Sequence, residues 1–397
     1  MVHIQSLSDL MSQVTGYIYP NEIHVHWTLL IVVYPYLTGL VAGAFILASL
    51  VKVFNIKELQ PTYRLSLLTA LAFLIIAPMP LLLHLGHPLR AYEIFLTPNL
   101  SSAMAMFGFV YAWYLMVVLL MEIWFDYRKD MVQWGRTERF PLNWIYRVLS
   151  FFSKDTSEEA IAFDAKAVKF ITILGIPSAF ILHGYVGFIF GSIKANPWWS
   201  SVLIPIVFLF SAIVSGIALI LLLYMIITPT RGEQIDMKCL DRVASFLLYA
   251  TIVDFSLEAL DFIHRLYESE ESINILADMV VNKLFVSLVV MQVLLGMLLP
   301  LGILILVKIY RFNAELRKLL YFMSAILIQV GIFSTRWNVV LGGQMFSKSF
   351  RGLTSYRMEI MGSEGLLVSL VLLILPFLVL AVLLKLLPPW GRPAKQA

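Results

Sequence analysis

The sequence of 397 residues contains one cysteine, Cys239, and few charged residues. A single cysteine cannot form an intrachain disulfide. Because there is also no CxxCH motif and no cysteine cluster, we expect no covalently attached haem, no iron–sulfur cluster and no cysteine-rich zinc site in this chain. The first twenty residues hold no Lys or Arg before an apolar run, so we expect no signal peptide there.

Only 14% of the residues are charged and 60% are hydrophobic, whereas an ordinary soluble domain has about 25% charged residues. This balance excludes a water-soluble protein and predicts an all-α polytopic membrane protein. A spanning helix takes about 20 residues, and nine apolar stretches are that long. They lie near 27–51, 65–86, 102–125, 167–190, 201–227, 243–264, 284–308, 316–341 and 365–387.

Lysine and arginine are divided unevenly between the two sides that nine spans would define. The loops after the first, third, fifth and seventh spans, with the C-terminal tail, hold 21 of the 29 Lys and Arg residues, and the other segments hold 8. Cytoplasmic loops carry the excess of positive charge. We therefore expect residues 1–26 outside, residues 388–397 in the cytoplasm, and the chain in the inner (cytoplasmic) membrane.

The long connection 126–166 differs from the other loops because it mixes charged and aromatic residues. This composition is typical of an amphipathic piece lying at the membrane interface. We expect Trp144 and Tyr146 to lie at the depth of the lipid headgroups.

Polar side chains of five spans fall in the outer half of the bilayer in this orientation, and ionisable residues inside spans are usually functional. His183 lies within the fourth span, beside Gly184 and Gly187, where a helix or a flat ring can approach closely. Histidines near helix ends are more often interfacial anchors, and we interpret His24 and His87 in that way. The remaining candidates are Tyr34, Tyr36, His84, Arg90, Tyr185, Arg336, Asn338 and Gln344.

Three carboxylates and an arginine follow one stripe of the sixth span. Asp254, Glu258, Asp261 and Arg265 are spaced so that they lie within about 60° of one another on a helix. An ion pair with Arg265 or a solvated face would also explain the stripe. Neighbouring carboxylates in a low dielectric repel each other when both are charged, so we favour a role in proton uptake and release.

The polar residues in the outer half of the bilayer include no set of a nucleophile, a base and a residue that orients the base, which argues against hydrolytic chemistry. A hydroquinone needs hydrogen-bond partners for its ring oxygens and proton acceptors nearby, and the histidines, tyrosines and carboxylates supply both. A b-type haem held by His84 and His183 is a weaker alternative. In the first span, the four-residue spacing of Gly39 and Gly43 favours a close helix crossing.

Four strings in order along the chain, TGLVAGAF, HLGHPLRAYEIF, HGYVGFIFGSIKANPWW and RWNVVLGGQ, resemble the NrfD-like family of membrane subunits from polysulfide reductase and related respiratory complexes. The resemblance covers about 25–345. It is greatest to the membrane subunits of the menaquinone reductase complex of sulfate reducers and of alternative complex III. One departure is His87, where the family more often has arginine.

The resemblance implies two four-helix bundles, here 27–190 and 201–341, followed by an additional transmembrane helix at 365–387. It also implies a pocket for menaquinone or another quinone in the first bundle. On this sequence the pocket residues would be Tyr34, Tyr36, His84, Arg90, His183 and Tyr185. Tyr34 stands where polysulfide reductase has a pocket histidine. A proton path through Asp254, Glu258 and Asp261 would lie in the second bundle.

The resemblance further implies a multi-cluster iron–sulfur subunit docked on the extracytoplasmic face. Further redox subunits, of the molybdopterin type, multihaem cytochrome c or both, would complete the complex. Family members carry no haem or iron–sulfur cluster of their own. We expect membrane lipids as the other contacts, no nucleic acid and no bound metal.

The sequence thus predicts the quinone-interacting membrane subunit of a multisubunit respiratory oxidoreductase with linked proton transfer. Two alternatives remain at this point. One is a proton- or cation-coupled secondary transporter, which an inverted repeat with broken helices would favour. The other is a structural anchor whose polar groups only stabilise the bundle.

Overall fold

The structure is a computed structural model that describes residues 14–99, 101–269, 271–310 and 312–390, apart from the side chains of 103–105. Parts of the two expected terminal segments, residues 1–13 and 391–397, lie outside the described residues.

Within these ranges the chain forms nine helices long and apolar enough to span a membrane. They match the nine stretches expected from the sequence, and the protein is a multi-pass integral membrane protein with an all-α fold. In chain order the spans are α2 (Leu29–Lys52); η2 (Lys57–Leu59), α3 (Gln60–Ile76) and α4 (Met79–His84); α6 (Ala103–Trp113), η4 (Tyr114–Leu120) and α7 (Met121–Thr137); α9 (Glu158–Gly191); α10 (Ile204–Thr230); α11 (Met237–Glu268); η5 (Phe285–Leu298) and α13 (Leu299–Ile309); α14 (Ala314–Val340) and η6 (Gly342–Gln344); and α15 (Leu366–Leu386).

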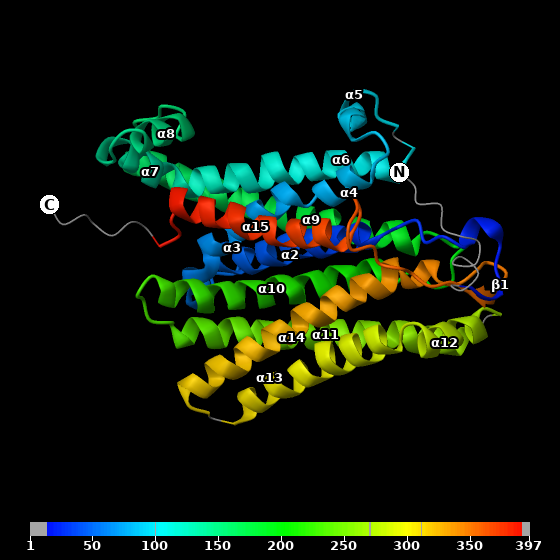
Figure 1. Ribbon diagram of the computed structural model, residues 1–397. Coiled ribbons are helices and arrows are strands. Elements are labelled where there is room, and N and C mark those ends of the chain that lie inside the picture. The colour runs from blue at the N-terminus through cyan, green and yellow to red at the C-terminus, as the bar shows by residue number, and fades with distance from the viewer. Residues whose placement is uncertain (1–13, 100, 270, 311, 391–397) are drawn as a thin grey trace.

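Short elements connect the spans at the two ends of the molecule. They are β1 (Thr15–Tyr17), η1 (Pro20–Glu22), η3 (Pro88–Arg90), α5 (Glu93–Leu96), α8 (Leu142–Leu149), α12 (Ile273–Asn282) and β2 (Arg351–Leu353). In Figure 1 the long helices lie side by side, with α8 at the left end and β1 and α12 at the right end. We call these the α8 end and the β1 end.

Helix α2 is the centre of the packing. It contacts α3, α9, α10 and α14, and α15 lies against α3. Helix α10 in turn contacts α11 and α14, and α14 contacts η5 and α13. Contacts exist within spans 1–4 and within spans 5–8, and the two groups are joined by the contacts of α2 and α9 with α10 and of α2 with α14.

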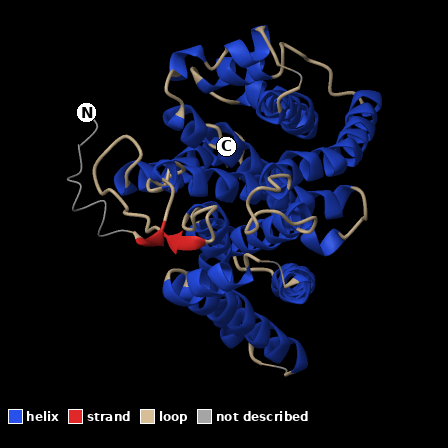
Figure 2. Cartoon of the chain, turned by 90° about the vertical axis from the view of Figure 1, so that its right-hand side faces the viewer, coloured by secondary structure: helices blue, strands red, loops and turns tan. Residues whose placement is uncertain are grey.

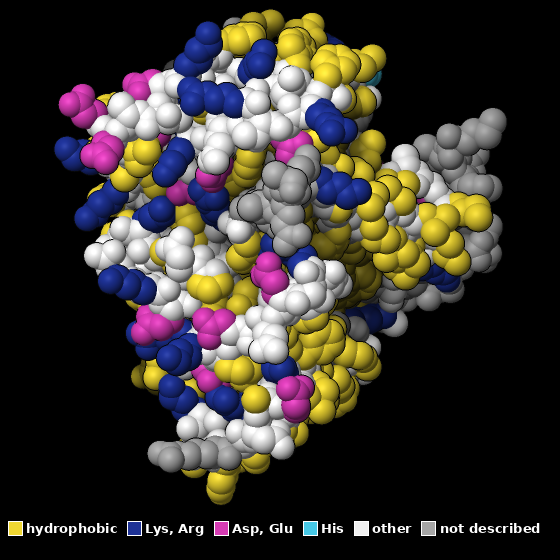
Figure 3. Space-filling view, turned by 90° about the vertical axis from the view of Figure 1, so that its left-hand side faces the viewer, with side chains coloured by type: hydrophobic (Ala, Val, Ile, Leu, Met, Phe, Trp, Pro, Cys, Tyr) yellow, Lys and Arg dark blue, Asp and Glu magenta, His cyan; other side chains and the backbone are white. Residues whose placement is uncertain are grey.

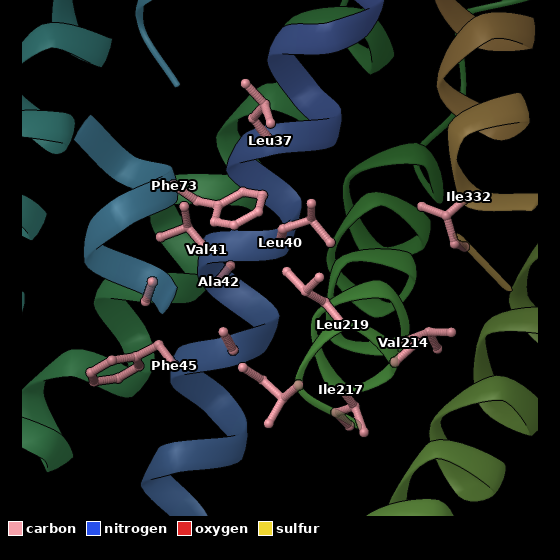
Figure 4. Close-up of a cluster of buried hydrophobic side chains, with 14 of the residues drawn as sticks. Leu37, Leu40, Val41, Ala42, Phe45, Phe73, Val214, Ile217, Leu219 and Ile332 are labelled. Carbon is pink, nitrogen blue, oxygen red and sulfur yellow. The ribbon is translucent and has the colours of Figure 1, made fainter. Parts of the chain in front are cut away.

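The crossing of α2 and α10 depends on glycines. A Cβ added at Gly43 would lie 2.1 Å from the carbonyl oxygen of Ala212, and one added at Gly216 would lie 2.4 Å from the Cα of Gly43. The expected close crossing at Gly43 is confirmed. Figure 4 shows Leu40 of α2 and Leu219 of α10 pointing into the space between the two helices. Because the backbones touch here, such side chains from both helices interdigitate on either side of the contact.

The connection 126–166 is more regular than the sequence indicated. Helix α7 continues to Thr137, and α9 begins at Glu158 with the hydroxyl of Ser157 accepting from the amide of Ala160. The buried ion pair between Arg128 Nη2 and Asp164 Oδ2, at 2.7 Å, joins α7 to α9. The intervening α8 is the expected amphipathic helix.

The two aromatic residues expected at headgroup depth differ in their exposure to the surroundings. Trp144 is exposed, as expected, but Tyr146 is fully buried, and its hydroxyl donates to the carbonyl of Leu386 at 2.7 Å. Tyr146 therefore holds the end of α15 against α8 and does not face the headgroups. Amphipathic spacing alone cannot reveal that a later helix covers one side of α8.

A small two-stranded sheet covers part of the β1 end. Strand β1 pairs antiparallel with β2, with Thr15 opposite Leu353, and Figure 2 shows this sheet at the end of the helix bundle. The carboxylate of Glu22 also accepts from the hydroxyl of Ser347 at 2.5 Å and from the amide of Lys348 at 3.0 Å. The N-terminal segment is thereby fixed to the connection between α14 and α15.

Candidate functional site

His183 of α9 is fully buried and contacts three other helices. Its Nδ1 lies 3.3 Å from Oγ1 of Thr38 on α2, and its Nε2 lies 3.2 Å from Nη2 of Arg336 on α14. The ring stacks on Phe208 of α10 with centroids 5.9 Å apart. A guanidinium only donates, so Nε2 is the acceptor and the proton is on Nδ1, which donates to Thr38. The imidazole is therefore neutral in this arrangement.

Glycines allow His183 to lie this close to its neighbours. A Cβ at Gly39 of α2 would come within 3.2 Å of His183 Cε1, so Gly39 leaves room for the ring. Gly187 lies against α10, where a Cβ would be 2.7 Å from the Cα of Pro205, whereas Gly184 has open space around it. Of the two glycines that follow His183 in the sequence, only Gly187 allows a neighbouring helix, α10, to pack closely against α9.

Arg336 is a fully buried arginine at the centre of the helix packing. Besides His183, its Nη2 donates to Oγ of Ser211 at 2.7 Å and to the carbonyl of Phe208 at 3.3 Å. The guanidinium carbon lies 4.1 Å from the centroid of the Phe208 ring, which is cation–π geometry. Its Nε and Nη1 have no hydrogen-bond partner within the described part of the chain. A charged group thus has unused donors in the protein interior.

Two of the predicted carboxylates lie beside this arginine. Asp254 and Glu258 of α11 are buried, and the guanidinium of Arg336 interacts electrostatically with both. Oε2 of Glu258 accepts from Nε2 of Gln292 at 2.7 Å. Oε1 of Gln292 accepts from Nδ2 of Asn338 at 2.7 Å. These bonds form a polar chain from α11 through η5 to α14.

The carboxylates differ in how fully they are bonded. Oδ1 of Asp254 and Oε1 of Glu258 have no hydrogen-bond partner among the described residues. Asp261, by contrast, forms an ion pair with Nε of Arg265 at 2.8 Å and accepts from the hydroxyl of Ser201. A cavity of about 60 Å³ lies beside Glu258, Asp261 and Gln292, which is large enough for water molecules.

A second group of polar side chains surrounds Phe107 of α6. The ring of Tyr34 meets that of Phe107 edge-on with centroids 5.5 Å apart, and the ring of Tyr185 stacks on it at 5.9 Å. The hydroxyls of Tyr34 and Tyr185 are buried and have no hydrogen-bond partner within the described part of the chain. Leaving a buried hydroxyl unpaired costs about 1–3 kcal/mol, so this aromatic cluster has two donors available for acceptors on a ligand.

A family model described as "Polysulphide reductase, NrfD" matches residues 20–348. The chain belongs to the NrfD family. This match covers spans one to eight, so every residue of the two polar groups lies within the NrfD region. The family resemblance expected from the sequence is confirmed.

Three curated relatives give the range of similarity of this NrfD-family chain. A selenate reductase subunit of Mesobacillus selenatarsenatis is 36% identical over 206 residues, covering 50% of this chain and 47% of that protein. A putative dimethyl sulfoxide reductase membrane subunit of Halobacterium salinarum is 29% identical, covering 52% and 46%. The Hdr-like menaquinol oxidoreductase integral membrane subunit of Archaeoglobus fulgidus is 25% identical, covering 87% and 77%. The matched part of the chain thus spans about half the length of the first two relatives.

The quinone-pocket residues expected for this NrfD-family chain do not form one group. Tyr36 faces away from Tyr34, and its hydroxyl donates to Oε1 of Gln329 at 2.8 Å. Nδ1 of His84 lies 3.0 Å from the carboxylate of Glu364 near the β1 end. Arg90 is largely exposed and pairs with Glu93. The tyrosines are separated because positions two apart on a helix point to opposite sides.

The structure therefore brings together Tyr34 and Tyr185 around Phe107, and His183 with Asp254 and Glu258 through Arg336. Arg336 was noted in the sequence only as one of several polar residues at the end of span 8. An arginine inside an apolar span was the signal that could have singled it out. The sequence gives no signal for its partners, because they come from α9, α10 and α11.

Proposed function

We propose that this chain is the quinone-interacting membrane subunit of a multisubunit respiratory oxidoreductase. In this proposal it exchanges electrons between an extracytoplasmic iron–sulfur partner and the menaquinone or quinone pool, with linked proton transfer. The observation that carries the proposal is the NrfD match over residues 20–348. The relatives' names add support, since they describe subunits of selenate and dimethyl sulfoxide reductases and of a menaquinol oxidoreductase. Partner subunits of the molybdopterin type or multihaem cytochromes c belong to the same proposal.

The quinone ring is proposed to bind between the aromatic side chains of α2, α6 and α9. A quinone presents two carbonyl oxygens, which accept hydrogen bonds, and the unpaired hydroxyls of Tyr34 and Tyr185 are donors. Phe107 lies between the two tyrosine rings, so entry of a flat ring requires this side chain to rotate. The aromatic surroundings suit a flat, apolar ligand.

Replacing both Tyr34 and Tyr185 by phenylalanine is expected to weaken quinone binding by about 10–30-fold, because two neutral hydrogen bonds of about 1 kcal/mol each are lost. The measurement is the KM for a soluble quinol analogue in the purified complex. Tyr36→Phe is the matched control, since the Tyr36 hydroxyl is already bonded to Gln329. An unchanged KM in the double variant, with a raised KM in the control, would contradict this site and indicate that the quinone binds on the side of α2 that carries Tyr36.

Proton transfer is proposed to run through Asp254 and Glu258. Each has a carboxylate oxygen with no bonded partner in the described structure, and Arg336 supplies a nearby positive charge. Asp261 was expected to take part as well. Its ion pair with Arg265 and its bond to Ser201 favour a structural role at the β1 end of α11.

The α8 end is proposed to face the cytoplasm. Figure 3 views the molecule from this end, where many Lys and Arg side chains lie among Asp and Glu, while the right of the view is mostly hydrophobic. The loops at this end, with the C-terminal tail, hold 21 of the 29 Lys and Arg residues, which agrees with the rule that cytoplasmic loops are positive. The β1 end, with the N-terminal segment, would then be extracytoplasmic and would receive the iron–sulfur partner.

Orientation is tested with single cysteines, because the native Cys239 is buried and competes little for reagents. A membrane-impermeant maleimide should label Lys348→Cys in intact cells and Lys154→Cys only after the membrane is opened. Both lysines are exposed, Lys348 at the β1 end and Lys154 at the α8 end, so they form a matched pair. The reverse pattern would invert the proposed topology.

A further inference from the structure

A buried carboxyl group lies at the other side of the molecule from Asp254 and Glu258. Glu122 is fully buried near the start of α7, in the half of the third span nearer the α8 end. Its Oε1 accepts from the hydroxyl of Thr172 on α9 at 2.8 Å and from the hydroxyl of Tyr63 on α3 at 3.2 Å. Its Oε2 has no hydrogen-bond partner, and Glu122 forms no ion pair, within the described part of the chain.

The helix next to Glu122 is irregular. The segment η4 (Tyr114–Leu120) is a π-helix and ends two residues before Glu122. Tyr114, on this segment, is fully buried, and its hydroxyl also lacks a hydrogen-bond partner among the described residues. π-helical turns occur frequently at functional sites. Two polar groups without partners among the described residues, one of them acidic, thus lie about two turns apart on the same span.

A cavity at the α8 end comes within one helical turn of Glu122. Asp126 lies one turn after Glu122 on α7 and lines a cavity of about 650 Å³, together with Lys52, Arg64 and Asp130. Oδ1 of Asp126 is 3.0 Å from Nζ of Lys52, and Oδ2 is 2.7 Å from Nε of Arg64. Charged groups therefore line the cavity up to one helical turn from Glu122.

On its other side Glu122 is closed off by apolar side chains. At Gly175, less than one turn from Thr172 on α9, an added Cβ would lie 2.2 Å from Cζ of Phe45 and 2.8 Å from Cγ1 of Val118. These side chains fill the space between α2, η4 and α9. His183 is about 16 Å further along α9 than Thr172. Apolar side chains therefore follow Thr172 on the side of α9 that leads toward the β1 end.

We propose that Glu122 is a proton-binding site that exchanges its proton with the adjoining cavity at the α8 end. A proton from water in the cavity binds the free Oε2 to give the neutral acid, and its release returns it to water; no other bond changes. The groups around Glu122 are Lys52 from α2, Tyr63 from α3, Tyr114 from η4 and Asp126 from its own helix, while α9 contributes the neutral Thr172. A role in supplying protons for quinone reduction rests on the proposed function, whereas proton binding itself does not.

Infrared spectroscopy of the purified complex in lipid nanodiscs tests the site without turnover. One carbonyl-stretch band of a protonated carboxyl should be present in the unmodified protein and lost in Glu122→Gln, whereas any bands that arise from Asp254 and Glu258 should remain. The matched control Asp130→Asn, at the rim of the cavity, should retain the band.

An infrared spectrum of Glu122→Gln identical to that of the unmodified protein across the neutral pH range would overturn the proposal. If Glu122→Gln does not assemble, Thr172→Val provides the answer, because loss of the hydrogen bond to Oε1 must shift the band of a protonated Glu122, and an unshifted band would again overturn it. A band that behaves as expected, with normal quinone turnover in Glu122→Gln, would keep the proton site and remove its link to electron transfer.

Discussion

Replacing Asp254 by asparagine is expected to slow quinone-linked electron transfer by about 10²–10⁴-fold, the range that a positioned proton-transfer group contributes. Asp254 is buried, one of its carboxylate oxygens has no partner among the described residues, and the carboxylate interacts electrostatically with Arg336. Asparagine keeps the shape of the side chain but cannot bind and release the proton. The measurement is the rate of quinol oxidation or quinone reduction by the purified complex, with its dependence on pH.

Two further variants separate proton transfer from a structural role. Asp254→Glu retains an ionisable carboxyl and should restore much of the activity with an altered pH profile. Asp261→Asn should instead lower the thermal stability, because it leaves Arg265 without its ion-pair partner. Normal turnover in Asp254→Asn, in a complex that is fully assembled, would exclude Asp254 from the proton path.

Replacing Gly216 by valine is expected to have the largest effect on stability, about 3 kcal/mol or more. The added Cβ would lie 2.4 Å from the Cα and carbonyl carbon of Gly43, and backbone atoms cannot move aside as a flexible side chain can. Helices α2 and α10 would have to separate, and these two helices join spans 1–4 to spans 5–8. The change should appear as a lower Tm of the detergent-solubilised protein and a smaller amount of chain in the membrane.

Gly184→Ala is the matched control for this substitution. Gly184 is also in the middle of a spanning helix, but an added Cβ meets nothing within 4 Å. Alanine is favoured over glycine in a helix by about 1 kcal/mol, so the control should be neutral or slightly stabilising. An equal loss of stability in both variants would show that glycine content, and not the α2–α10 contact, determines the result.

Arg336 interacts with polar side chains from two different helices, α9 and α11. It contacts His183 on α9 of the first group of spans and acts on Asp254 and Glu258 on α11 of the second. Tyr36 and Gln329 make another hydrogen bond between α2 and α14. A change of charge at either carboxylate therefore alters the electrostatic interaction with the arginine that donates to His183.

The positions of the spans followed from the sequence with little ambiguity. Each expected stretch has a helix, because about 20 apolar residues in a bilayer must satisfy their backbone hydrogen bonds internally. The boundaries were less accurate at α7 and α9, whose ends extend beyond the apolar core on charged, well-packed turns such as that of Arg128 and Asp164. Hydropathy does not detect helix ends that are stabilised by ion pairs.

The site was predicted less completely than the spans. The position of a residue along a span indicates its depth in the bilayer, so the grouping of polar residues toward one side could be predicted from the sequence. The direction in which each side chain points around the helix axis could not be predicted: Tyr34 faces Phe107 while Tyr36 faces Gln329. His84 is bonded to Glu364, which lies 280 positions later in the chain. No local pattern indicates such a partner.

The amino-acid order alone determined the nine spanning-length apolar helices in the described part of the chain, since composition and run length fix how much backbone must be shielded from lipid. It also determined which side chains are costly enough inside a span to need a partner. Only the packing of the helices decided which partners those side chains have, from Thr38 and Arg336 around His183 to Tyr63 and Thr172 around Glu122. The physical reason is that partner choice depends on helix rotation and on close contacts such as Gly43 with Gly216, which involve residues far apart in the sequence.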